Sequence, residues 1–362
     1  LGRRDLTELT RLLARGGVVA LSVALLMLVF QTPLLRLMLW LIHPTDDVVP
    51  LVSTYFSICI WGAPAMLGLY TLTGWLVGMQ NTRLPMLTAI VQNVVNIVAS
   101  LLLVFGMRWG LRGVALGTLV AQYAGLAMAL WITCRSYGRL YPYFQWHGLL
   151  CYEAMSRFFT VNRDIFLRTL FLVGVNLCFT SAGARQGAVI LSVNTILMQF
   201  YLLFSYVMDG FAYAGEAMGG RYYGADNHVA FRDTLRRVMG WGVAMAMLFT
   251  LFYAAGGKLV IRMLTDDAVV RQVASVYLPW TCVVPVVSVC AFIWDGIFIG
   301  ITATRSMLFS AVVAALGFGA VGLSLWPVWG NHALWLAMVV FLLLRGLVLV
   351  AVYLYKVRPR LV

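Results

Sequence analysis

The chain has 362 residues, of which 62% are hydrophobic and 11% are charged, and its 26 Lys and Arg against 13 Asp and Glu give a formal net charge of +13. Soluble domains carry about 25% charged residues. This deficit, with a mean hydropathy of +0.90, excludes an ordinary cytosolic enzyme, a disordered tail and a disulfide-stapled secreted module. The composition is that of a polytopic membrane protein.

Long apolar stretches follow one another along the chain, separated by short polar breaks. A spanning helix needs roughly 20 mostly apolar residues, and uninterrupted runs predict helices rather than barrel strands because backbone groups in lipid must be satisfied within the segment. We therefore predict an all-α polytopic fold with ten transmembrane helices. The predicted spans cover residues 17–41, 51–78, 84–105, 113–133, 165–183, 187–213, 238–264, 269–300, 307–326 and 333–355.

Basic residues concentrate in the breaks on one side of the predicted spans. That side collects 17 of the Lys and Arg residues and the other side collects 5, while four lie within spans. By the positive-inside rule the richer side is cytoplasmic. The charge is thus interpreted as topology rather than as nucleic-acid affinity, and it predicts an inner (plasma) membrane protein with both chain ends in the cytoplasm. The five on the opposite side are Arg108, Arg112, Arg185, Arg262 and Arg271.

Cysteine and histidine give no sign of a metal or catalytic site. The six cysteines are scattered without a C-x-x-C spacing, and the four histidines lie on different connections. Metal centres and redox motifs need such residues close together. We therefore expect no metal, no cofactor other than a transported coupling ion, and no enzymatic activity.

A fixed offset of 222 residues reveals an internal repeat. Small residues at G-x-x-x-G spacing let helices approach closely, which explains each glycine individually. It does not explain why the order Gly, Gly, Thr, Arg recurs at the end of the second span in both copies. A duplication of the whole segment explains this recurrence. The shift maps Gly74, Gly78, Thr82 and Arg83 onto Gly296, Gly300, Thr304 and Arg305.

The repeat also predicts the domain organisation. A two-span hairpin precedes the second copy but not the first, so two equal lobes would require a further hairpin upstream, and we expect the chain to be a fragment that lacks it. The predicted parts are an N-lobe of four spans (1–134), a cytoplasmic linker with an amphipathic helix (135–163) and a C-lobe of six spans (164–362). Parallel repeats of this kind are related by an axis along the membrane normal.

Several segments resemble the multidrug and toxic compound extrusion (MATE) transporters, in particular their DNA-damage-inducible-protein (DinF)-like subgroup. The segments are Asp-Gly-Phe-Ala-Tyr-Ala-Gly-Glu at 209–216, Trp-Asp-Gly-Ile-Phe-Ile-Gly at 294–300, Asn-Arg-Asp-Ile-Phe-Leu-Arg-Thr at 162–169 and Gly-Val-Ala-Leu-Gly-Thr at 113–118. The resemblance covers essentially the whole chain. It implies a two-lobe bundle of twelve spans, of which this chain would hold the third to the twelfth.

Three acids lie within predicted spans or just beyond the end of one, and an ionised carboxylate at the centre of a span costs about 2.5–3.5 kcal/mol. They are Asp209, Glu216 and Asp295. Asp295 is open to two interpretations, a carboxylate hydrogen-bonded between helices or a protonatable, cation-binding group. The resemblance favours the second, because an Asp on the family's tenth span contributes to cation binding in one branch, although that branch's partner acid on the seventh span has no counterpart between residues 165 and 183.

Polar residues of the N-lobe suggest the remains of a second cation site. Asn96 and Ser100 are four residues apart and share a helical face. By resemblance, Asn96 and Thr118 match the Asn and Thr of the family's N-lobe site, and Ser100 stands where a second Asp is expected. Interhelical hydrogen bonding is the alternative, and it is favoured for Asn93 and Gln122. Secondary candidates are Glu216, Asn93, Gln122, Asn194 and Gln199.

The function expected from these features is cation-coupled efflux, with H+ or Na+ driving export of small organic, cationic and drug-like compounds by alternating access. We expect a monomer in contact with membrane lipid and no nucleic-acid partner. A lipid-linked oligosaccharide flippase of the same architecture is the alternative and ranks lower, because it would need a wide basic cavity. Arg168 and Arg345 within spans could suit an anionic substrate, but interhelical pairing or extension of their side chains to the membrane surface accounts for them better. An integral-membrane enzyme fits less well.

Overall fold

The computed structural model describes residues 6–42, 49–143 and 151–357, and these residues form helices and short connections without a strand. Ten of its helical segments are long and apolar enough to cross a membrane, which confirms the predicted class and the number of spans. The α-helices are α1 (Leu6–Val29), α2 (Gln31–Ile42), α3 (Val49–Cys59), α4 (Ala63–Gly78), α5 (Arg83–Leu101), α6 (Gly110–Tyr137), α7 (Tyr152–Arg185), α8 (Ala188–Gly224), α9 (His228–Leu264), α10 (Ala268–Gly300), α11 (Thr304–Trp329) and α12 (Asn331–Val352).

The described chain divides into two compact units, an N-terminal unit up to Ala154 and a C-terminal unit from Met155 onward. The boundary falls inside the stretch 135–163 that the sequence assigns to a linker. In the structure α6 extends to Tyr137, a 3-10 turn covers Gly138–Tyr143, and α7 begins at Tyr152. Part of the predicted linker is therefore the first turns of a long helix, and its residues 144–150 lie outside the described residues.

In the N-terminal unit α5 and α6 form a hairpin, α3 and α4 pack against α6, and α1 packs on α4. The predicted first span, 17–41, was wrong in its bounds, because the spanning helix covers Leu6–Val29 and a separate helix α2 follows. Pro33 lies in the first turn of α2 and has no N–H to donate to the preceding turn. The chain therefore breaks between the two helices, although hydropathy stays high across the break.

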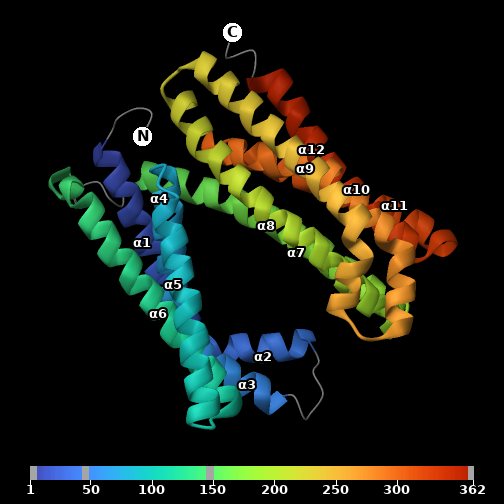
Figure 1. Cartoon of the computed structure of the whole chain (residues 1–362). Helices are drawn as coiled ribbons and strands as arrows, with labels where there is room; N and C mark the ends of the chain where they lie inside the picture. The colour runs from blue at the N-terminus through green and yellow to red at the C-terminus, as the bar shows by residue number, and fades with distance from the viewer. Residues whose placement is uncertain (1–5, 43–48, 144–150, 358–362) are drawn as a thin grey trace. The chain divides into compact units, whose positions relative to one another are not determined.

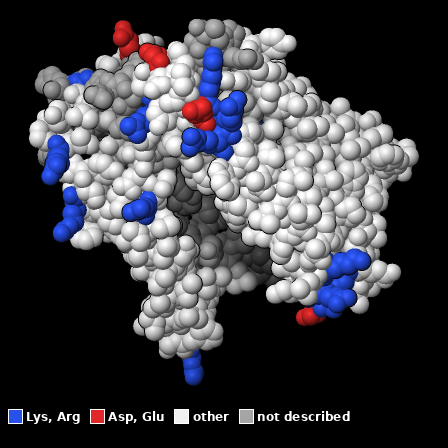
Figure 2. Space-filling view, turned by 45° about the horizontal axis from the view of Figure 1, so that its top comes forward, with Lys and Arg blue, Asp and Glu red and all other residues white. Residues whose placement is uncertain are grey.

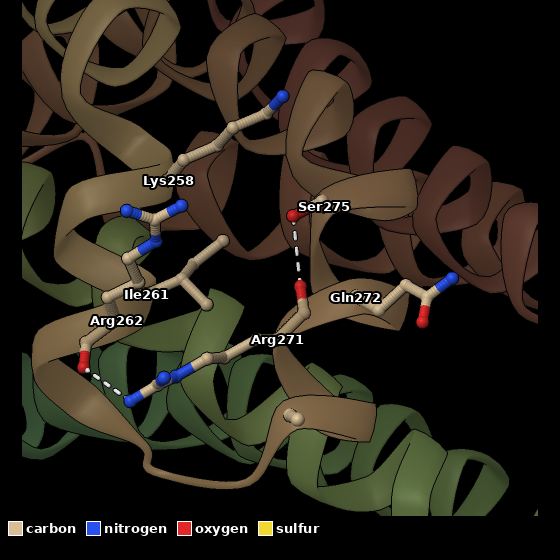
Figure 3. Close-up of a pocket in the computed structure, with 7 residues that line it drawn as sticks. Lys258, Ile261, Arg262, Arg271, Gln272 and Ser275 are labelled. Atoms are coloured by element: carbon tan, nitrogen blue, oxygen red, sulfur yellow. Dashed lines mark hydrogen bonds between the residues drawn. The ribbon is translucent and has the colours of Figure 1, made fainter.

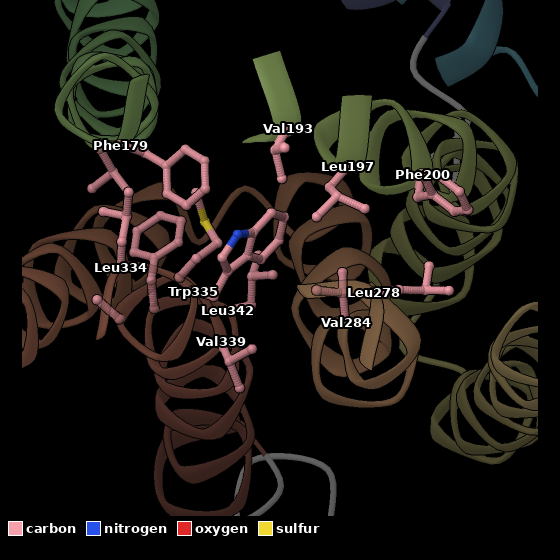
Figure 4. Close-up of a cluster of buried hydrophobic side chains, with 14 of the residues drawn as sticks. Phe179, Val193, Leu197, Phe200, Leu278, Val284, Leu334, Trp335, Val339 and Leu342 are labelled. Carbon is pink, nitrogen blue, oxygen red and sulfur yellow. The ribbon is translucent and has the colours of Figure 1, made fainter. Parts of the chain in front are cut away.

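In the C-terminal unit α10 lies at the centre, in contact with α8, α9 and α12, and α11 packs on α12 (Figure 1). Buried side chains of all six helices from α7 to α12 form its largest apolar cluster, part of which is drawn in Figure 4. Trp335 is fully buried in this cluster and meets the ring of Phe179 edge to face, with 5.2 Å between centroids. Aromatic pairs in this geometry add about 0.5–1.5 kcal/mol beyond area burial.

On the face drawn in Figure 2, charged side chains form separate groups with wide uncharged areas between them. This distribution is the one expected of helices that cross lipid, because a charge in the hydrocarbon region is costly and is retained only where it is paired or functional.

The internal repeat reappears as an identical backbone turn. Helices α4 and α10 end at the equivalent residues Gly78 and Gly300, and each is followed by a left-handed residue, Gln80 (φ 62°) and Thr302 (φ 56°), 222 positions apart. Two backbone bonds of the Schellman type close both turns. A third turn of the same type, around Asp226 (φ 51°), follows the end of α8. The bonds are Gln80 N to Val77 O (2.8 Å), Asn81 N to Leu76 O (2.9 Å), Thr302 N to Ile299 O (2.9 Å), Ala303 N to Phe298 O (2.9 Å), Asp226 N to Tyr223 O (3.2 Å) and Asn227 N to Tyr222 O (3.0 Å).

The signature glycines of the two copies differ in their surroundings. A Cβ at Gly296 would lie 2.1 Å from the Ala212 carbonyl oxygen, and one at Gly300 would lie 2.4 Å from that of Glu216, so both glycines let α10 approach α8 at backbone distance. At Gly74 and Gly78, by contrast, a Cβ would meet no atom of the described residues within 4 Å. The same motif therefore makes a helix contact in the C-terminal unit only.

This difference predicts opposite effects of one substitution at equivalent positions. Gly296→Ala should lower the stability of the folded protein by about 1–3 kcal/mol, because α8 must move away from α10. Gly74→Ala should leave the unfolding temperature unchanged or raise it, because Ala forms helices better than Gly by about 1 kcal/mol. Thermal unfolding of the purified full-length protein in detergent measures both, and equal unfolding temperatures for the two variants would contradict the packing difference.

Candidate functional site

Asp295 is the centre of a buried ion cluster in the C-terminal unit. The residue is only 6% exposed, and its Oδ2 accepts a hydrogen bond from Arg345 Nη2 of α12 at 2.6 Å and a second from Arg168 Nη2 of α7. The Arg345 side chain is also buried, and its guanidinium lies over the ring of Phe292, 5.6 Å from the centroid. One carboxylate thus joins three helices, since Asp295 lies on α10.

Several polar atoms in this cluster remain without a hydrogen-bond partner among the described residues. They are the second carboxylate oxygen, Asp295 Oδ1, and the Nε atoms of both arginines. A buried polar atom without a partner costs about 1–3 kcal/mol, so a structure retains few of them. The cluster therefore has one carboxylate oxygen and two donors that a proton, a water molecule or a ligand can still engage.

The other two intramembrane acids lie on α8. Asp209 is half-buried and interacts electrostatically with Arg345 and Asp295, and no ion pair joins it within the described part of the chain. Glu216 lies two turns further along, and its backbone carbonyl is the atom that packs against Gly300. Arg345 also interacts with Tyr201 on α8. Asp209 thus interacts with Arg345 only electrostatically, without a hydrogen bond or ion pair to it among the described residues, and Glu216 lies nearer the end of its helix.

Asn194, a secondary candidate, belongs to a separate buried amide network. Its Nδ2 donates to Asn331 Oδ1 at 2.8 Å, and Asn331 Nδ2 donates back to Asn194 Oδ1 at 3.0 Å. Trp335 Nε1 donates to the same Asn194 oxygen at 3.0 Å. These reciprocal bonds hold α8 against the start of α12, and buried polar groups with all partners in place fix a unique packing. Gln199, the neighbouring candidate, is exposed.

The N-terminal candidates lie where α5 meets α6. Ser100 Oγ donates to Asn96 Oδ1 at 3.2 Å, and a Cβ at Gly117 would lie 2.4 Å from Ser100 Oγ. Thr118, the neighbour of that glycine, donates to the carbonyl of Val114 in its own helix at 3.0 Å. Asn96 and Ser100 therefore form one polar pair at a close helix contact.

The two remaining N-terminal candidates have different surroundings. Asn93 is exposed and donates to the Ala89 carbonyl at 2.8 Å. Gln122 packs against Gly62 and buries its Oε1 without a partner in the described residues.

An apolar cavity of about 1100 Å³ lies in the C-terminal unit, along α7 and α11 and beside the start of α12. Phe171, Phe318 and Trp326 contribute aromatic surface to it, and the polar groups of its wall include Ser181, Arg185 and Gln186. Sites for organic molecules are concave and mostly apolar, with a few polar groups, and usually enclose about 300–1000 Å³. The cavity is slightly larger than this range and has the lining of such a site.

Comparison with known proteins identifies the family. The MatE family model matches residues 1–102 and 165–323. DNA damage-inducible protein F of Escherichia coli K12 is 37% identical over 360 residues, which cover 97% of this chain and 76% of that protein. The chain belongs to the MATE family. Protein DETOXIFICATION 42 of Arabidopsis thaliana is 25% identical over 96% of this chain, which spans 66% of the plant protein.

Solved structures show that this MATE-family chain also has the family's fold. The Vibrio cholerae MATE transporter VcmN, in its bent form, superimposes with a TM-score of 0.83 at 16% identity, over 99% of this chain and 84% of the other. An outward-facing multidrug resistance MATE family transporter of the MOP superfamily gives a TM-score of 0.81 at 17% identity, over 100% and 84% of the two chains. The resemblance inferred from the sequence motifs, including the MATE-type bundle, is confirmed.

The pairing of Asp295 was not resolved by the sequence. Arg168 and Arg345 are 127 and 50 positions away from it, and the sequence left open whether they pair, reach the membrane surface or bind an anionic substrate. One signal was present: four basic residues lie within predicted spans, and an isolated intramembrane charge is so costly that it should pair with an acid at similar depth.

The geometry predicts an order of stability among variants of the cluster. Asp295→Asn removes the acceptor of two ion pairs, whereas Arg168→Met removes one donor and leaves the Asp295 to Arg345 pair. Breaking a buried pair costs about 3–5 kcal/mol, so Asp295→Asn should lower the unfolding temperature more than Arg168→Met. The exposed Asp233→Asn change in α9 is the matched control and should have no effect. Equal shifts for the first two variants would contradict the shared role of the carboxylate.

Proposed function

We propose that the protein is a secondary active exporter that couples the entry of a cation to the efflux of small organic compounds by alternating access. Family membership supports transport, and the division into two compact units supports bodies that can move relative to each other. The observation that carries the coupling proposal is the position of two intramembrane acids around the buried Arg345: Asp295 pairs with it, and Asp209 interacts with it electrostatically without an ion pair among the described residues.

The proton is the coupling ion that this site favours. Asp295 is already held by two guanidinium groups, so a metal cation would have to displace them, whereas a proton needs only one carboxylate oxygen. The described residues contain no group of three or more His, Cys, Asp or Glu that could hold a metal ion. Asp209, which has no ion pair in the described part of the chain, is the group we assign to proton exchange, with Asp295 as its electrostatic partner.

The net charge of the cluster explains why a proton and an organic cation would be exchanged rather than carried together. Two ionised aspartates and two arginines are together neutral, and one added proton makes the cluster cationic. A site of low dielectric disfavours a second positive charge, so a proton and an organic cation would exclude each other. Coupling by population shift requires such a difference in affinity between states.

The apolar cavity of α7 and α11 is the place we propose for the organic substrate. Its aromatic side chains offer flat surfaces for apolar and cation-π contact. The positive-inside pattern supports a location in the cytoplasmic (inner) membrane with both chain ends in the cytoplasm, and the ion cluster and the cavity both lie within a single C-terminal unit, so a monomer suffices for function.

Neutralising Asp209 tests the coupling. Asp209→Asn should reduce proton-driven efflux of a fluorescent organic cation from proteoliposomes at least tenfold, because the protonatable group is lost, without lowering the unfolding temperature. The full-length protein is assayed under an imposed H+ gradient and, separately, an imposed Na+ gradient. Asp233→Asn, the same chemical change at an exposed position, should transport normally. Unchanged H+-driven export by Asp209→Asn would remove this residue from the mechanism, and export driven by Na+ alone would refute the choice of ion.

Filling the cavity tests the substrate site. A Cβ at Gly319 meets no atom of the described residues within 4 Å, and this glycine lines the cavity. Gly319→Trp should therefore occupy part of the cavity, raise the KM for the organic cation severalfold and leave the fold intact. Gly240→Trp is the control, because Gly240 is exposed on α9 with equally open space. Identical KM values for the two variants would argue against the cavity as the substrate site.

A further inference from the structure

A second cavity, of about 450 Å³, lies at the end of α9 and the beginning of α10, far along the chain from the coupling acids (Figure 3). Three of its lining residues are cationic: Lys258, Arg262 and Arg271. Gln272 and Ser275 supply neutral polar groups, and the fully buried Ile261 lies between the basic residues of α9. None of the residues that line this cavity is acidic.

Lys258 and Arg262 are the unneutralised part of this cavity. They are four residues apart on α9, so they occupy one face, where like charges are mutually destabilising. Both side chains are exposed, and neither has an ion pair within the described ranges of the chain. Two adjacent cations that open into a concave space create a positive potential that an anion would relieve.

Arg271 has a fixed place in the wall. Its Nε donates to the Thr265 carbonyl at 2.7 Å, and its Nη2 donates to the Arg262 carbonyl at 3.3 Å and to Asp266 Oδ1 at 3.0 Å. These bonds close the end of α9 and hold the guanidinium in one position. Asp266 itself is fully exposed beside the cavity, and Asp267 is occupied as the N-cap of α10.

General electrostatics of helix ends explains only part of the cluster. A cation in the last turn of α9, such as Arg262, is favoured by the helix dipole. The dipole of α10 opposes Arg271, which lies in the first turn of that helix, and Lys258 lies more than a turn before the end of α9. The predicted topology also assigns this end of both helices to the side of the membrane that is poor in basic residues, so the positive-inside rule does not account for the cluster.

The depth of the cavity indicates what kind of anion can reach it. Lys258 precedes the last residue of α9 by six positions, about 9 Å along a helix axis, so the cations span the depth from the helix end toward the edge of the hydrocarbon region. Phosphates of phospholipid headgroups lie near the ends of membrane-spanning helices, where Lys and Arg attract anionic lipids. Long basic side chains also extend toward this layer.

We propose that this cavity binds the phosphodiester of an anionic phospholipid, with Lys258 and Arg262 contacting the phosphate and Gln272 donating to the headgroup. The site is distinct from the coupling acids and does not depend on the transport mechanism proposed above. Its ligand is a component of the membrane, so an occupied site would brace the α9 to α10 connection.

The test compares lipid binding to the full-length protein by native mass spectrometry in a neutral detergent. Wild type should bind phosphatidylglycerol about tenfold more tightly than phosphatidylcholine, because both carry a phosphate but only the first is a net anion. The Lys258→Gln/Arg262→Gln double variant should lose this preference. Arg112→Gln, a matched change of an exposed arginine assigned to the same side of the membrane, should keep it.

Additional arms keep the outcome decisive. Thermal unfolding measures whether the double variant is folded. If it is not folded, the single change Lys258→Gln, which alters one exposed side chain, takes its place and should weaken phosphatidylglycerol binding severalfold. Equal binding of the two lipids by wild type, or wild-type binding by a folded double variant, would overturn the proposal. Complete displacement of phosphatidylglycerol by millimolar inorganic phosphate would overturn the assignment to a lipid, since a soluble anion would then be the ligand.

Discussion

The constraint on which the C-terminal unit depends is the cost of placing charge in a medium of low dielectric. Asp295 meets this cost by accepting from Arg168 and Arg345 with the same oxygen, which ties α7, α10 and α12 together. The helix contacts nearby are correspondingly tight: Ser310 Oγ donates to the Arg345 carbonyl at 3.2 Å, and Gly346 faces the backbone of Ala291 with no room for a side chain. An ion cluster held this firmly can change its net charge only by gaining or losing a proton or a ligand, which is the property a coupling site needs.

Two kinds of polar site thus coexist in one helical body. The amide network of Asn194, Asn331 and Trp335 satisfies its central oxygens and joins helices without leaving a free charge. The cluster of Asp295 leaves a carboxylate oxygen and two guanidinium nitrogens unpaired among the described residues. A fully satisfied network rigidifies a core, whereas a partly satisfied one can still respond to a ligand. The amide network therefore suits a structural role, and the cluster of Asp295 suits the binding of a proton or a ligand.

Sequence reasoning recovered the features that depend on local composition. Ten apolar runs predicted ten spans because the length of a spanning helix is fixed by the bilayer, and the repeat predicted equivalent helix ends at Gly78 and Gly300. The first span was misplaced since hydropathy does not register the break that Pro33 imposes. The partners of Asp295 and the contrast between Gly296 and Gly74 depend on which helices meet in space, and that information is not contained in the spacing of residues along the chain.

The three Schellman turns have a consequence of their own. Each uses a residue other than glycine in the left-handed region, Gln80, Asp226 and Thr302, and an ordinary residue there is held at a cost of about 1–2 kcal/mol. The chain therefore stores a small amount of backbone strain at the ends of α4, α8 and α10. Introducing glycine at one turn at a time would release that strain locally, so the rigidity of individual helix ends could be adjusted without altering a single lipid-facing or ion-binding side chain.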